Sequence, residues 1–62
     1  MYQPGDTVKY QTSHIRTQNT EIMAQVKTGV IEEAFATLDN LPCYWIVGEP
    51  ELILCRQIIK KI

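Results

Sequence analysis

A β-hairpin is predicted between residues 43 and 55, where the chain reads CYWIVGEPELILC. Residues 43–47 are a dense run of residue types that favour strands, and Gly48-Glu49-Pro50 is a turn signal. A second, apolar strand is predicted over residues 51–55. Two strands joined by so short a turn pair as an antiparallel hairpin, so this stretch predicts a β fold.

Working outward, the flanking segments predict further strands. Residues 7–11 alternate polar and apolar side chains directly after the turn signal Pro4-Gly5-Asp6. Residues 58–62 predict a short last strand, preceded by a helical turn at Arg56-Gln57. Residues 12–20 are mostly polar and predict a long loop.

Residues 20–38 fit two interpretations. Ile22, Val26 and Val30 lie nearly at helical spacing. Gly29 and the β-branched residues around it oppose a helix, and a glycine just before a strand commonly marks a bulge or tight bend. The favoured fold is therefore mostly β, a small five-stranded barrel in a single domain over residues 1–62. The alternative is an α+β fold with one helix over residues 20–38.

Composition narrows the class of protein. The chain has 62 residues, 45% of them hydrophobic, and a net charge of −1. This balance argues against binding driven mainly by long-range charge. No apolar run approaches a membrane span and no secretory signal is recognised, so no membrane partner and a cytoplasmic location are expected.

Small domains usually need extra stabilisation from disulfides, a metal or self-association. Two cysteines and one histidine are too few for a disulfide framework or a four-ligand zinc site. Self-association is expected by elimination.

The elements together resemble the SH3-like barrel over nearly the whole chain. The resemblance rests on short features that occur in the same order: Gly5-Asp6 before the first strand, a long first loop, Gly29-Val30-Ile31 opening a bent strand, residues 44–47, residues 52–54 and a terminal strand over 58–62.

The spacing is also similar to that of the plasmid-borne type II dihydrofolate reductases, because Gly29 and Tyr44 reproduce the interval between two residues of that family. The family's activity depends on a Val-Gln-Ile-Tyr strand that lines the central pore of a homotetramer. Ile53 and Cys55 stand here where the Gln and the Tyr would be. The resemblance implies a similar architecture and an origin on a mobile element, and it does not imply reductase activity.

Side-chain alternation in the hairpin predicts an exposed apolar patch. If Leu52 and Leu54 fill the barrel, their neighbours point outward, and Tyr44 and Ile46 point inward on the paired strand. The predicted partner-binding residues are Trp45, Val47, Ile53 and Cys55. The alternative is a register slipped by one residue, which would place Trp45 in the core.

No catalytic arrangement is recognised. His14 is the sole histidine and lies in a polar segment, and Glu32 and Glu33 are adjacent, so a strand would point them to opposite faces. Glu49 and Glu51 flank a proline in a turn, where solvated carboxylates are expected. There is no phosphate-binding loop, dinucleotide fingerprint or metal-ligand spacing, so no enzyme activity, cofactor or metal is expected.

Three functions follow as hypotheses. The first is a non-enzymatic binding module that self-associates or docks on a protein partner through the apolar patch. The second is a nucleic-acid accessory protein that uses basic residues, namely Arg16, Arg56, Lys60 and Lys61. The third is a small-molecule site in the central pore of an oligomer.

Overall fold

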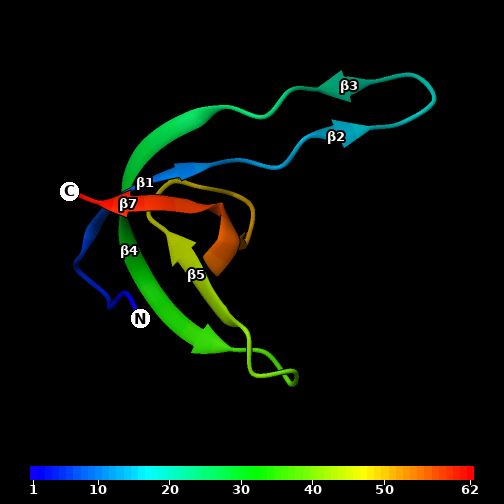
Figure 1. Ribbon diagram of the computed structural model, residues 1–62. Coiled ribbons are helices and arrows are strands. Elements are labelled where there is room, and N and C mark those ends of the chain that lie inside the picture. Colours follow the sequence, from blue (N-terminus) through cyan, green and yellow to red (C-terminus); the bar gives the residue numbers. More distant parts are fainter.

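Half of the chain lies in β-strands, and the only helical element is one turn of 3-10 helix (Figure 1). The computed structural model describes all 62 residues. In chain order the elements are β1 (Thr7–Gln11), β2 (Ile15–Arg16), β3 (Glu21–Ile22), β4 (Val26–Ala36), β5 (Pro42–Ile46), β6 (Ile53–Leu54), η1 (Cys55–Gln57) and β7 (Ile58–Lys61). The mostly-β prediction is confirmed, as is the short helical turn before the last strand.

Five strands form one antiparallel sheet in the order β6-β5-β4-β1-β7. Its edge strands, β6 and β7, do not pair with each other, so the sheet is not closed into the expected barrel. β6 has only two residues, and η1 begins immediately after it.

The long strand β4 gives the sheet its curvature (Figure 1). Its first half pairs with β1 and its second half with β5, and the register shifts between Ile31 and Glu33. The strand interpretation is therefore confirmed and no helix forms over residues 20–38, but the strand begins at Val26, so Gly29 lies inside it and the irregularity comes two residues later. Gly29 lies at a close approach, because a Cβ atom there would be 2.6 Å from Cγ2 of Ile46.

A second, two-stranded sheet projects from the body where a polar loop was expected (Figure 1). Ile15 lies opposite Ile22 and Arg16 opposite Glu21. The connecting turn is held by Thr17, whose backbone N–H donates to the carbonyl of Thr20 at 2.7 Å. We call residues 13–24 the hairpin arm.

The concave side of the main sheet holds the core. Seven buried side chains form it: Val8, Tyr10, Ile31, Tyr44, Ile46, Ile53 and Ile58. Tyr2 packs edge-on against the ring of Tyr44, with 5.8 Å between ring centroids. No helix of the structure has the length and apolar character needed to cross a membrane.

Candidate interaction surface

The face of β4 and β5 opposite the core carries four exposed apolar side chains. On β5, Tyr44 and Ile46 are in the core, so strand alternation turns Trp45 outward. Val47, two residues after Trp45, also faces outward. Trp45 is 37% exposed and Val47 is 60% exposed. The predicted orientation of these two residues is confirmed.

The neighbouring strand β4 supplies the other two side chains. Gly29 and Ile31 approach the core, so Val30 between them faces outward, and it is 41% exposed. Ala34 packs against the core, so the next residue, Phe35, faces outward and is exposed. We call Val30, Phe35, Trp45 and Val47 the outer patch.

Register makes these four residues neighbours. The backbone N–H of Val47 donates to the carbonyl of Val30 at 3.0 Å. Trp45 pairs with Glu33 across the ladder, and Phe35 is two residues further along the same strand. The outer patch therefore extends across two strands, and the exposed Glu33, directly opposite Trp45, lies on the same face between Val30 and Phe35.

The prediction that Ile53 and Cys55 belong to this patch is wrong. Ile53 is 0% exposed and belongs to the core, and Cys55 is half-buried and packs against the core. The reason is register: Tyr44 pairs with Ile53, and directly opposite residues of an antiparallel pair lie on the same face. An inward Tyr44 therefore requires an inward Ile53.

Cys43, like Trp45, lies on the outward side of β5. It is nevertheless fully buried, although it is not a member of the core cluster. Phe35 pairs with it on one side and Leu54 on the other, and its Sγ is 3.6 Å from the carbonyl oxygen of Leu41. Phe35 is thus both a member of the outer patch and the ladder neighbour of a buried cysteine.

The four basic residues predicted to bind nucleic acid lie on three separate elements. Arg16 is on the hairpin arm, Arg56 is on η1, and Lys60 and Lys61 are on β7. Two of them face carboxylates: Arg16 Nε is 3.9 Å from Glu21 Oε2, and Lys61 Nζ is 3.4 Å from Asp6 Oδ1. The structure does not bring the four together with one another as a single basic surface.

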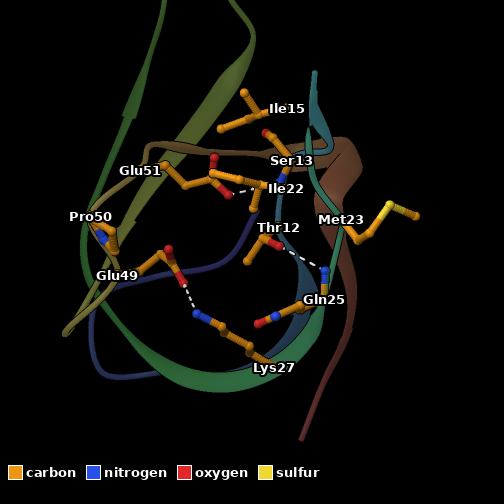
Figure 2. A pocket seen from close by; sticks show the side chains of 10 residues that line it. All are labelled: Thr12, Ser13, Ile15, Ile22, Met23, Gln25, Lys27, Glu49, Pro50 and Glu51. Atoms are coloured by element: carbon orange, nitrogen blue, oxygen red, sulfur yellow. Dashed lines mark hydrogen bonds and ion pairs between the residues drawn. The ribbon is translucent and has the colours of Figure 1, made fainter. Parts of the chain in front are cut away.

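A cavity of about 290 Å³ lies between the hairpin arm and the turn at residues 49–51 (Figure 2). Contrary to the expectation of a solvated turn, the side chain of Glu49 is only 4% exposed. Its Oε1 accepts hydrogen bonds from the hydroxyl of Tyr10 at 2.8 Å and from Nζ of Lys27 at 3.3 Å. Burial of Glu49 follows from these long-range partners, which no local pattern in the turn signals.

The buried Tyr10–Glu49 pair predicts a loss of stability at high pH. Burial, together with the hydrogen bond to Glu49, raises the pKa of Tyr10 to about 12 from an ordinary value of 10.0. Below pH 10 the tyrosine is protonated in both the folded and the unfolded state. Between about pH 10 and 12 only the unfolded state releases the proton, so the free energy of unfolding falls by about 2–3 kcal/mol.

Thermal melts from pH 8 to 12 measure this loss, with Tyr10→Phe as the control. The variant should lack this part of the alkaline destabilisation. An identical pH dependence in both proteins would contradict the assignment.

Comparison with known proteins does not assign the chain to a family. No protein-family model, curated protein or solved structure matches the chain. The resemblances to SH3-like barrels and to the plasmid-borne reductases stay predictions, and the outer patch and the cavity are interpreted from their own chemistry.

Proposed function

We propose that the chain is a small, non-enzymatic protein-binding module whose first partner is a second copy of itself, bound through the outer patch. The observation that carries the proposal is that Val30, Phe35, Trp45 and Val47 lie exposed together on one face of the sheet. Contiguous exposed apolar side chains mark interaction surfaces more often than isolated ones do.

The small core supports self-association in particular. Seven residues form the core cluster, whereas thirteen large hydrophobic side chains are exposed. Both cysteines are free, so no disulfide compensates for the small core. A second copy that covers the outer patch would remove apolar surface from water, at about 25 cal/mol for each Å².

The outer patch alone does not make a whole interface. A stable interface buries about 800 Å² on each partner, which would be under a fifth of the 4563 Å² surface of this chain. Glu33, directly opposite Trp45, would lie within this interface, so its carboxylate would have to keep contact with water or face a cationic group of the second copy.

The only tryptophan of the chain reports directly on the patch. If a second copy covers Trp45, its fluorescence emission should move to shorter wavelength as protein concentration rises. Val47→Glu should abolish this shift and weaken association at least ~10-fold, because a carboxylate in the apolar centre loses its hydration. Trp45→Ala should weaken association similarly in a sedimentation experiment.

Ile59→Glu is the matched control, since Ile59 is an exposed apolar residue on β7, away from the patch. It should associate like the parent chain. Equal loss of association in Val47→Glu and Ile59→Glu, or an emission maximum independent of concentration in the parent chain, would refute the proposal.

A further inference from the structure

The cavity between the hairpin arm and the turn has two walls of different chemistry (Figure 2). The arm contributes the apolar side chains of Ile15 and Ile22, and the turn contributes the carboxylates of Glu49 and Glu51. Lys27 supplies the one ammonium group. Two carboxylates against one ammonium leave the cavity with one excess negative charge.

The two carboxylates are held in place and keep free acceptor positions. Glu51 Oε1 accepts the backbone N–H of Ser13 at 2.8 Å, and Glu49 Oε1 accepts both Tyr10 and Lys27. Both hydrogen bonds of Glu49 go to Oε1, and no protein donor reaches Oε2. Every fully buried side-chain oxygen of the structure has a hydrogen-bond partner, so Oε2 must keep some contact with solvent. The Glu49 side chain as a whole is only 4% exposed. Figure 2 shows Oε2 on the side away from Lys27.

We infer that this cavity binds a small organic cation, an ammonium or guanidinium group attached to an apolar body. The cationic group would donate to the free oxygens of Glu49 and Glu51, and the apolar body would lie against Ile15 and Ile22. Apolar walls with a few fixed polar groups are the usual make-up of small-molecule sites. The volume of about 290 Å³ suits a ligand of metabolite size.

Binding would join the hairpin arm to the body. The arm is a two-stranded hairpin in which only two residue pairs face each other, and such a hairpin is marginally stable by itself. A ligand that contacts Ile22 on one side and Glu51 on the other would bridge the two parts. The inference concerns a site apart from the outer patch, and it does not depend on self-association.

The test is an NMR titration of the full chain with two matched probes, 2-phenylethylammonium and its neutral isostere 2-phenylethanol. The amine should give saturable shifts at the amides of Ser13, Ile22 and Glu51, with a dissociation constant of ~10 mM or tighter, as suits so small a ligand. The alcohol should bind at least ~10-fold more weakly, because it cannot form charge-assisted hydrogen bonds.

Variants separate the site from general charge. Glu51→Gln keeps an oxygen for the Ser13 N–H but removes the charge, so it should fold normally and weaken the amine at least ~10-fold, the ratio that corresponds to a lost hydrogen bond to a charged group. Asp39→Asn removes the same charge from an exposed position in the turn after β4 and should leave the affinity unchanged. Absence of saturable shifts, equal binding of amine and alcohol, or equal losses in the two variants would overturn the inference.

Discussion

Replacing Ile53 by glutamate should unfold the domain. Ile53 is 0% exposed and packs in the core on the same side as Tyr44. A carboxylate there would be buried without a partner, at a cost of several kcal/mol. A single small core rarely supplies more than about 3–5 kcal/mol of stability. The cost of burying the carboxylate is therefore comparable to the whole free energy of unfolding of the domain. Circular dichroism and NMR dispersion at 25 °C would measure the loss.

Val47→Glu is the matched control for Ile53→Glu, because it places the same charge at an exposed position of the same hairpin. It should retain a dispersed NMR spectrum and a cooperative melt. If Ile53→Glu instead melted cooperatively within ~5 °C of the parent chain, a shift of about 1 kcal/mol or less, the register between β5 and β6 would be wrong.

Gly29→Ala should be strongly destabilising although alanine is a small residue. The added Cβ would lie 2.6 Å from Cγ2 of Ile46 and 3.4 Å from Cε1 of Tyr10. Ile46 is β-branched and buried, so its methyl group cannot turn aside freely. Overpacking of this kind costs about 1–3 kcal/mol. That exceeds the gain of about 0.5–1 kcal/mol that alanine normally brings in a strand interior.

The expected result is a fall in Tm of about 4–8 °C for each kcal/mol lost in a domain of this size. Thr28→Ala, at the exposed neighbouring position of β4, is the control and should change the stability by less than about 0.5 kcal/mol. A Tm for Gly29→Ala equal to or above that of the parent chain would show that β4 and β5 do not approach each other as closely as described.

Local residue patterns predicted the five strands of the main sheet and the helical turn. The strand β4 was the ambiguous case, because Ile22, Val26 and Val30 mimic helical spacing. Gly29 and its β-branched neighbours correctly favoured a strand. In the structure Gly29 leaves room for the side chain of Ile46 on β5. The arm was missed because Ile15 and Ile22 are isolated apolar residues in a polar segment, and their pairing becomes visible only in three dimensions.

Properties that depend on register could not be predicted in the same way. A one-residue shift moves every side chain of a strand to the other face, and the choice of Leu52 and Leu54 as inward residues misplaced Ile53. Phe35 and Val30 were missed as members of the outer patch, because their facing depends on the register shift in β4. The burial of Glu49 depends on Tyr10 and Lys27, which are far from it in the sequence.

The most direct test of self-association is the solution mass, measured by light scattering behind a sizing column at two protein concentrations and two salt concentrations. The account predicts a stable multiple of 7.1 kDa. This mass should change little with salt, because contact through an apolar patch is not screened by ions. Val47→Glu should elute at the monomer mass. A parent chain that remains at 7.1 kDa under all four conditions would contradict the central claim.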